Sequence, residues 1–339
     1  YGDHRDLHLS IRRQRQMCIR DRILVVCAKE GSSQYVAELL REHDIQAFTM
    51  EGGILSWGNL YDTRIIFQAA WGQIIQIARP ARGDLSFVIV SNGKAAIIDP
   101  LRHTQHYSQA VAKAGADLTH IFDTHVHADH ISGGPALQEQ YNASYYVHAY
   151  DAIHPIDMLP ARIAYKALED GQTFQIGALK LTTIWYPGHT LGQVNYLVEA
   201  PDSARFLFTG DGIFLRSFGR PDLGGKGEAW TPMLYDSMAR RLPPHLTDET
   251  IILPAHFSTL DECDQNGHCA ASWADVKRNN DSLSHLSSEA EFTAFVLGNL
   301  PVFPPQYVEI KRVNIGLSHP TEQQAEELEL GKNICALAK

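Results

Sequence analysis

Long apolar runs, cysteine and positive charge are all scarce in this sequence of 339 residues. No apolar run approaches the roughly 20 residues that span a bilayer, so the sequence predicts no membrane helix. Five cysteines at irregular positions are too few for a disulfide scaffold and are typical of a reducing compartment, so we expect a cytoplasmic protein. Lysine and arginine total 29 against 39 acidic residues, and a net charge of -10 argues against nucleic-acid binding because it repels phosphate backbones.

Histidine and core-forming residues, by contrast, are plentiful. The chain has 17 histidines, and 44% of its residues are hydrophobic, which is ordinary for a globular protein with a sizeable core. At about 150 residues per domain, the length indicates about two domains. Residues 1–22 carry six arginines, match nothing downstream and are interpreted as non-native or disordered. We expect a small α/β fragment over residues 23–62, a main domain over 63–280 and a C-terminal extension, 281–339, packed on it.

Apolar runs bounded by turn residues predict most of the strands. They cover residues 23–26, 47–50, 85–91, 94–99, 118–124, 144–148, 179–185, 193–198, 205–209 and 250–253. Helices are predicted over residues 34–43, capped by Ser33, and over 107–114, 134–141, 233–241 and 271–280. The tail is expected to hold one helix, a proline-rich turn at 301–305 and a strand at 307–310. Hairpins followed by strand–helix alternation indicate an α/β fold whose sheets are covered by helices on their outer faces.

Metal-binding residue types cluster directly after the apolar strand that ends near residue 122. His125, His127, Asp129 and His130 fall within six residues, and each would cost stability in a core unless it found a polar partner. At the C-terminal end of a strand they would instead converge on a cleft, where borderline metals bind imidazole nitrogen and carboxylate oxygen. The density of this motif therefore predicts a metal site.

Three further residues of the same types follow apolar strands. His189 comes after residues 181–186, Asp211 after 206–208 and His256 after 251–253. Glycines next to His189 and Asp211 permit the tight turns that aim the side chains. Each residue alone could be a surface group in a turn, but the recurrence favours one shared metal site.

Over residues 65–260 the sequence resembles the metallo-β-lactamase fold superfamily. The resemblance supplies the ligand positions of that superfamily in order: His125, His127, Asp129, His130, His189, Asp211 and His256. It implies an α/β fold of the αββα sandwich type with the metal at one edge. It does not decide the chemistry, because the superfamily includes hydrolases, nucleases and oxygenases.

Three segments around the motif resemble the persulfide dioxygenase branch of this superfamily, namely residues 124–134, 214–223 and 331–336. The resemblance implies one Fe(II) held by His125, His189 and Asp211, with open positions suited to O2 and a persulfide sulfur. It further implies oxidation of a small-molecule persulfide, typically glutathione persulfide, to sulfite and the free thiol. Water would release the sulfite after oxygen insertion.

The other four ligand-type residues leave an alternative open. His127, Asp129, His130 and His256 either orient the iron ligands and stabilise charge near the metal, or hold a second metal ion. With two Zn or Fe ions the protein would resemble glyoxalase II and would cleave a thioester by metal-bound hydroxide. Residue identity alone does not separate these two enzymes.

The small fragment over residues 23–62 carries a candidate site of its own. Cys27, after a strand and before a helix, and residues 51–57 resemble the active loop and the closing segment of rhodanese sulfurtransferases. Backbone N–H groups of such a loop, with the helix N-terminus, lower a cysteine pKa and cradle a sulfur anion. Only the second half of a rhodanese domain is matched, so we expect impaired sulfur transfer, and the fusion favours persulfide chemistry. A carrier or scaffold that uses Cys27 without turnover is a further alternative.

Arg220, two cysteines and the acidic tail have less specific interpretations. Arg220 either steadies an anionic substrate or Asp211 near the metal, or pairs with Asp222 in a loop. Cys263 and Cys269 are interpreted as surface-loop cysteines, because their spacing does not match a zinc pair. The acidic helix expected over residues 322–330 is interpreted as a solvated face. The expected partners are a small-molecule persulfide and O2, with no nucleic acid and no membrane, and the chain could form a homo-oligomer.

Overall fold

The computed structural model describes residues 22–330 and 333–337. The chain divides into two compact units, Tyr1–Leu60 and Tyr61–Lys339. The stretch interpreted as non-native, residues 1–22, lies outside the described residues except for Arg22. Among the residues that are described, no helix is long and apolar enough to cross a membrane.

The first unit is a short α/β arrangement. Strands β1 (Arg22–Val25) and β2 (Gln46–Thr49) pair in parallel, and α2 (Gly31–Arg41) makes the crossover that a parallel pair needs. Helix α3 (Gly53–Gly58) follows β2. The predicted cap is wrong: Glu30 is the N-cap of α2, and Ser33 lies inside the helix, where its hydroxyl donates to the Glu30 carbonyl at 2.8 Å.

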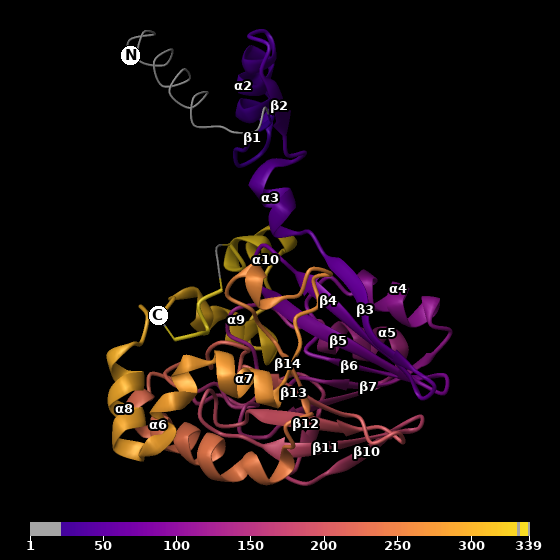
Figure 1. The fold of residues 1–339 in the computed structure, drawn as a ribbon, viewed down its shortest axis with the longest axis vertical. Coiled ribbons are helices and arrows are strands. Elements are labelled where there is room, and N and C mark those ends of the chain that lie inside the picture. The colour runs from indigo at the N-terminus through magenta and orange to yellow at the C-terminus, as the bar shows by residue number, and fades with distance from the viewer. Residues whose placement is uncertain (1–21, 331–332, 338–339) are drawn as a thin grey trace. The chain divides into compact units, whose positions relative to one another are not determined.

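The second unit contains two mixed sheets (Figure 1). The first has seven strands in chain order: β3 (Asp62–Ala69), β4 (Gly72–Arg79), β5 (Asp84–Ser91), β6 (Lys94–Ile98), β7 (Asp117–Phe122), β8 (Ser144–His148) and β9 (Lys166–Leu168). The second has six: β10 (Thr173–Ile176), β11 (Leu179–Trp185), β12 (Val194–Glu199), β13 (Arg205–Gly210), β14 (Ile251–Pro254) and β15 (Ala271–Ser272). Pairing is parallel from β6 to β9 and between β13 and β14, and antiparallel elsewhere.

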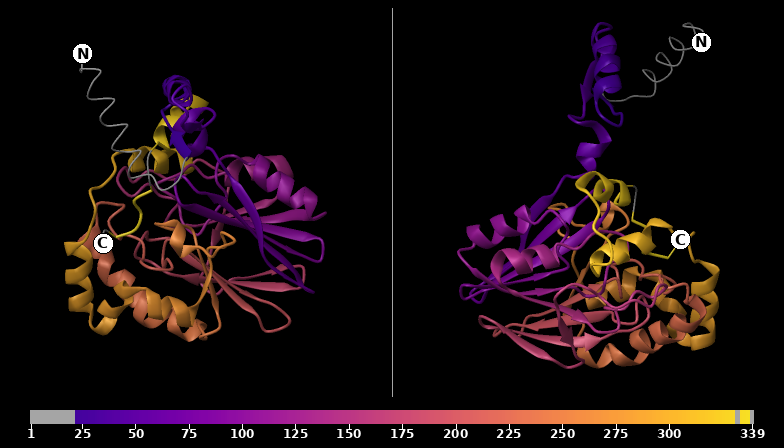
Figure 2. Two further views of the ribbon diagram at one scale, coloured as in Figure 1. Left: turned by 45° about the horizontal axis from the view of Figure 1, so that its top comes forward. Right: turned by 180° about the vertical axis from the view of Figure 1, so that it is seen from behind.

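The two sheets pack face to face with helices outside, as Figures 1 and 2 show. Because side chains alternate along a strand, Phe87 of β5 joins the core between the sheets, where it meets Phe208 of β13, while Val88 joins the outer core. Helices α4 (Gln105–Lys113) and α5 (Gly134–Tyr141) cover the first sheet, and α6 (Gly227–Asp236) and α7 (Trp273–Asn279) cover the second. This arrangement confirms the predicted αββα sandwich.

Most predicted strands and helices of the second unit are confirmed to within a few residues. Strands β8 and β11 and helix α5 have the predicted bounds. The sequence interpretation missed the hairpin β3–β4 and the short strands β9, β10 and β15. The helix expected over residues 233–241 begins earlier, as α6, and ends in a π-helical turn, Ser237–Arg241.

The tail differs most from the predictions. It forms α8 (Glu289–Gly298), α9 (Gln306–Asn314) and α10 (Glu322–Leu328), so the strand predicted at residues 307–310 is wrong. Tyr307, Ile310 and Asn314 are buried at helical spacing, which a four-residue window could not reveal. The interpretation of Cys263 and Cys269 as surface-loop cysteines is wrong for Cys269, which is buried, and the two residues form a disulfide.

Candidate metal centre

The loops that follow β7, β11, β13 and β14 carry all seven predicted ligand residues, and all seven are buried. Gly210 allows two of these loops to meet. It has a φ of 51°, and a Cβ there would overlap the hydroxyl of Thr124, which immediately precedes the first histidine. The turn therefore brings Asp211 next to the loop of the motif.

Three of the seven residues converge on one point. Potential ligand atoms of His125, His189 and Asp211 lie within 4.8 Å of one another. Asp211 Oδ2 is 3.4 Å from His189 Nε2 and 3.9 Å from His125 Nε2. These three atoms are buried, and none has a hydrogen-bond partner among the described residues. Buried polar atoms without partners are costly, so this cluster fits a divalent metal ion.

Hydrogen bonds fix the ring orientation and tautomer of both histidines. His189 Nδ1 donates to the Arg220 carbonyl at 2.7 Å, which leaves the lone pair on Nε2. The Thr124 hydroxyl donates to Asp99 and accepts from His125 Nδ1 at 3.0 Å, with the same consequence. Burial lowers the pKa of both histidines, and that of His125 falls well below its ordinary value. Both rings are therefore neutral and present Nε2 as a metal ligand needs.

The imidazole of His256 lies between two carboxylates and forms a hydrogen bond with each. Its Nδ1 lies 2.5 Å from Asp211 Oδ1, and its Nε2 lies 3.0 Å from Asp129 Oδ2. Burial lowers the pKa of His256, but Asp211 and Asp129 outweigh that effect and raise it well above its ordinary value. His256 thus holds one oxygen of Asp211 and leaves the other, Oδ2, for the cluster.

Asp129, His130 and His256 form a second group with Asp84, whose ligand atoms also lie within 4.8 Å of one another. Asp129 Oδ1 and His130 Nε2 in this group have no hydrogen-bond partner among the described residues. The sequence interpretation missed Asp84, whose signal is its position as the first residue of β5. This group is the place where a second metal ion could bind.

The structure separates His127 from both groups. Its Nε2 donates to Asp99 at 3.1 Å, and it forms a third group with Asp99 and Asp123. Burial lowers the pKa of His127, but Asp99 outweighs it and raises the value to about 9. Asp99 and Asp123 were also missed, although each directly follows a strand in the way that the predicted ligands do.

Arg220 contacts the cluster through its backbone carbonyl, which accepts a hydrogen bond from His189. The side chain is fully buried, and the guanidinium pairs with Asp222 at 2.6 and 2.8 Å and donates to the Pro301 carbonyl at 2.7 Å. The Arg220 carbonyl is the group that orients His189. These contacts agree with the interpretation in which Arg220 pairs with Asp222 in a loop. A direct role of the guanidinium in catalysis stays a prediction.

Residues of the tail hold the motif loop, the segment 125–132 that carries four of the ligand residues. The sequence interpretation gave none of these tail residues a role in the site. Asn314 of α9 donates to the carbonyls of His127 and His130, both at 2.8 Å. Asn333 donates to Asp129 Oδ2 at 2.7 Å. Glu329, expected on a solvated face, is instead buried and accepts from the Ile131 N–H at 2.8 Å. The tail is therefore part of the site.

Cys27 in the first unit sits in a loop held by α3. The Ile54 N–H donates to the Cys27 carbonyl at 2.9 Å, and the Ser33 N–H points to the sulfur at 3.4 Å. Hydrogen bonds with the Ser33 side chain and the Ser33 N–H, with smaller ones with Lys29 and Ser32, lower the pKa of Cys27 from 9.0 to about 7. A thiolate is therefore well populated at neutral pH.

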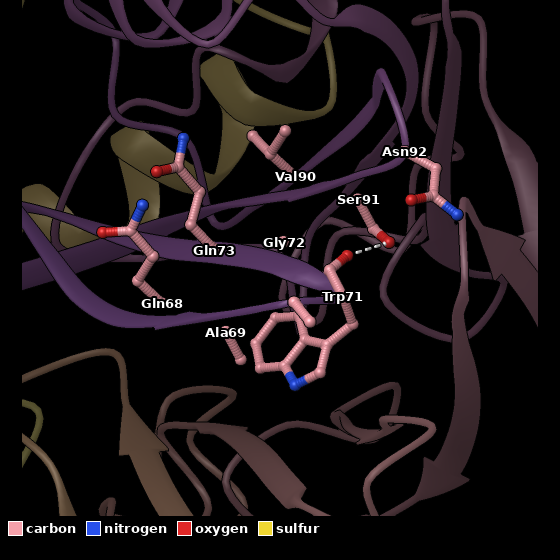
Figure 3. A pocket seen from close by; sticks show the side chains of 9 residues that line it. Gln68, Ala69, Trp71, Gly72, Gln73, Val90, Ser91 and Asn92 are labelled. Atoms are coloured by element: carbon pink, nitrogen blue, oxygen red, sulfur yellow. Dashed lines mark hydrogen bonds between the residues drawn. The ribbon is translucent and has the colours of Figure 1, made fainter.

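One surface pocket lies away from all these groups. Residues 68–73 and 90–92, at the tips of the β3–β4 and β5–β6 hairpins, line it (Figure 3). The Ser91 hydroxyl donates to the Trp71 carbonyl there at 2.5 Å. None of the lining residues is an acid, a base, a cysteine or a histidine. None of the predicted site residues therefore lines this pocket.

Comparisons with known proteins agree with this geometry. The profile described as "Metallo-beta-lactamase superfamily" matches residues 80–256. Human mitochondrial persulfide dioxygenase ETHE1 is 30% identical over 232 residues, which cover 67% of this chain and 82% of that protein. A hydroxyacylglutathione hydrolase of Nitrosococcus oceani is 32% identical over 216 residues, covering 60% of this chain and 76% of the hydrolase. The crystal structure of ETHE1 from Myxococcus xanthus aligns with a TM-score of 0.57 and 26% identity, covering 77% of this chain and 100% of that one. The chain belongs to the metallo-beta-lactamase superfamily.

Proposed function

We propose that this protein is a persulfide dioxygenase that uses one Fe(II) held by His125, His189 and Asp211. The observation that carries the proposal is the set of three converging, unpartnered ligand atoms, two imidazole nitrogens and one carboxylate oxygen. Such a set is typical of non-haem iron oxygenases, and the iron, when bound, would supply open positions for O2 and a sulfur anion together. The similarity to the human persulfide dioxygenase ETHE1 and to ETHE1 from Myxococcus xanthus supports the same reaction.

The reaction consumes a small-molecule persulfide, with glutathione persulfide as the expected substrate. The outer sulfur takes up both atoms of O2, water supplies the third oxygen, and the S–S bond breaks to release sulfite and the thiol. In this chain Thr124 and the Arg220 carbonyl keep the two imidazoles oriented. His256 holds Asp211 Oδ1 in a hydrogen bond, so the carboxylate presents a single oxygen to the cluster.

A binuclear thioester hydrolase of the glyoxalase II type is the second candidate. The group of Asp84, Asp129, His130 and His256 favours it, because it could hold a second Zn or Fe ion. The similarity to a hydroxyacylglutathione hydrolase supports it as well. The two enzymes differ in metal count and in their need for O2.

The test is oxygen uptake by anaerobically purified, iron-loaded protein supplied with glutathione persulfide. We expect uptake with matching sulfite and one iron per chain, both lost in His189→Ala. His148→Ala is the matched control, because His148 stacks on Trp185 and belongs to none of the ligand groups. In His130→Ala we expect the iron to remain. Two metals per chain, one of them lost in His130→Ala, with S-lactoylglutathione cleaved without O2, would establish the hydrolase instead.

We further propose that residues 23–62 are the C-terminal half of a rhodanese-like domain in which Cys27 carries sulfane sulfur. The support is the lowered pKa of Cys27 and the N–H groups around its sulfur. Incubation with thiosulfate should add one sulfur atom to the wild type and none to Cys27→Ser, as read by mass spectrometry. Transfer of that sulfur to cyanide at ordinary rhodanese rates would contradict the expected impairment.

A further inference from the structure

Lys311 is a buried cation on the inward face of α9. Its exposure is 4%, similar to that of its buried helix neighbours Tyr307 and Asn314. Asn314, three residues later, bonds the carbonyls of His127 and His130, and Tyr307, four residues earlier, accepts from the Ile334 N–H. Residues three and four apart share one face of a helix, so Lys311 lies on the face that covers the motif loop.

Among the described residues, no carboxylate lies within 4.0 Å of the Lys311 ammonium, and none accepts a hydrogen bond from it. The next residue behaves differently, because Arg312 pairs with Asp157 at 2.6 and 2.9 Å and with Glu309 at 3.1 Å. An ammonium without a counter-ion is expensive to bury. Burial accordingly lowers the pKa of Lys311 below its ordinary value.

The charged groups that act on Lys311 include Asp129, a residue of the second ligand group. The ammonium is within electrostatic reach of Asp151, Cys335 and Asp129, and of the candidate ligands His125 and His189.

Both nearby carboxylates already accept hydrogen bonds from other residues. Asp151 accepts from the Val126 N–H, the Thr190 hydroxyl and the Gly192 N–H, each at 2.8 Å. Asp129 Oδ2 accepts from Asn333 at 2.7 Å and lies 3.0 Å from His256 Nε2. Neither carboxylate lies within ion-pair distance of the Lys311 ammonium, so no described carboxylate neutralises this charge where an anion would enter the cluster.

We propose that Lys311 binds the anionic sulfur end of the substrate, the outer sulfur of a persulfide before the reaction and sulfite after it. This inference rests on the proposed function. Lys311 is assigned to the sulfur end of the substrate because the residue is buried beside the ligand loops. The carboxylates of a glutathione carrier are several bonds away from the outer sulfur and would lie farther from the cluster.

Sulfite binding to the anaerobic, iron-loaded protein tests the site without turnover. Isothermal titration should show affinity weakened about tenfold or more in Lys311→Met, with a smaller loss in Lys311→Arg, since a charge-assisted hydrogen bond is removed in the first and kept in the second. Arg312→Met removes a charge from the same helix and should bind sulfite as the wild type does. Equal affinity in wild type and Lys311→Met would overturn the proposal.

Thermal unfolding distinguishes anion binding from a structural role of Lys311, and a change of carrier distinguishes the two ends of the substrate. Lys311→Met should retain iron and unfold at the same or a higher temperature, because it replaces a buried charge that pairs with no described carboxylate by a side chain of similar length. A lower melting temperature would assign Lys311 a structural role and refute the proposal.

In Lys311→Met the KM should rise equally for glutathione persulfide and for 2-mercaptoethanol persulfide, which has no carboxylate. A rise confined to glutathione persulfide would refute the assignment to the sulfur end.

The two proposals can fail independently. Absent O2 uptake combined with Lys311-dependent sulfite binding would overturn the dioxygenase and support the anion site. O2 uptake by the wild type, combined with unchanged sulfite affinity in Lys311→Met, would support the dioxygenase and overturn the anion site.

Discussion

The buried carboxylate of Glu329 should be one of the strongest single supports of the second unit. It accepts from Arg79 at 2.7 Å, from Arg102 at 2.8 Å and from the Ile131 N–H at 2.8 Å. The two arginines precede it by 250 and 227 residues, so one side chain ties the tail to β4, to the segment after β6 and to the motif loop. Its side chain is 1% exposed, which removes the screening that weakens surface ion pairs.

Glu329→Gln keeps the shape of this side chain and removes its charge. Taking one partner out of a buried ion pair costs about 3–5 kcal/mol, against a total stability of about 5–15 kcal/mol for a typical domain. At about 2–4 °C per kcal/mol for a domain of roughly this size, the melting temperature should fall by roughly 6–20 °C. Thermal unfolding followed by circular dichroism at pH 7 measures this directly.

Glu327→Gln, two residues earlier in α10, is the matched control. Glu327 is exposed, and its carboxylate accepts from the Gln323 amide at 3.0 Å on the helix surface, so its loss should change stability by less than about 0.5 kcal/mol. If Glu329→Gln melts where Glu327→Gln does, the buried pair does not hold the tail and the reasoning fails.

The pH dependence follows from the same contacts. Burial raises the pKa of Glu329, but Arg79 and Arg102 outweigh it and hold that pKa below its ordinary value. A carboxyl whose pKa is lower in the folded state stabilises the fold above its unfolded pKa of about 4.3, and this stabilisation is lost as the pH falls through the folded pKa. The gap between wild type and Glu329→Gln should therefore be constant from about pH 6 to 8 and shrink in acid.

Three shorter predictions concern single contacts. Ser33→Ala removes the largest cause of the lowered pKa of Cys27, so the pH midpoint of alkylation by iodoacetamide should move from about 7 toward 9.0; an unchanged midpoint would contradict this. Thr124→Val removes the hydroxyl that orients the first histidine and should weaken iron binding about 10–100-fold, as measured with a competing chelator. Gly219→Ala places a Cβ on the carbonyl oxygen of Asp211, so the variant should lose metal and about 1–3 kcal/mol of stability, and unaltered iron content would count against the described packing.

The sandwich itself could be predicted because its strands are apolar on both faces. Strands β5 and β13 bury Phe87 and Phe208 in the core between the sheets, and Val88 and Leu207 in the two separate outer cores, which produces continuous apolar runs in the sequence. The ligand residues could be predicted for a related reason, since each is a polar group placed directly after such a run. The β3–β4 hairpin was missed because residues 62–69 alternate between exposed and half-buried positions and form only a weakly apolar run.

Residues held by long-range contacts could not be predicted. Nothing near Glu329 in the sequence distinguishes it from the exposed acids of α10, because its two arginine partners are more than 200 residues away. Lys311 similarly lies in a charged run, and only the helical geometry of α9 separates it from Arg312. The division of the ligand residues into three groups depends on Asp84 and Asp99, whose distances to the histidines are set by the packing of the sheets.

The superfamily profile ends at residue 256, but residues after this position form hydrogen bonds that hold the motif loop. Asn314 satisfies the carbonyls of His127 and His130 and accepts from the Ser132 N–H at 2.8 Å. Asn314→Ala should therefore leave buried backbone groups without partners, at about 1–3 kcal/mol for each group left unsatisfied, and weaken iron binding about 10–100-fold because the ligand loop loosens.

Asn299→Ala is the control for this prediction, because the Asn299 amide donates to the Phe295 carbonyl of the preceding helix, away from the motif loop, and its loss should leave iron affinity unchanged. Chelator competition and thermal unfolding of the two variants compare them directly. If Asn314→Ala binds iron as tightly as Asn299→Ala, the tail is only packed against the site and does not shape it. If it binds iron more weakly, residues outside the sandwich set the properties of the metal centre, which would explain how one superfamily fold supports different chemistry.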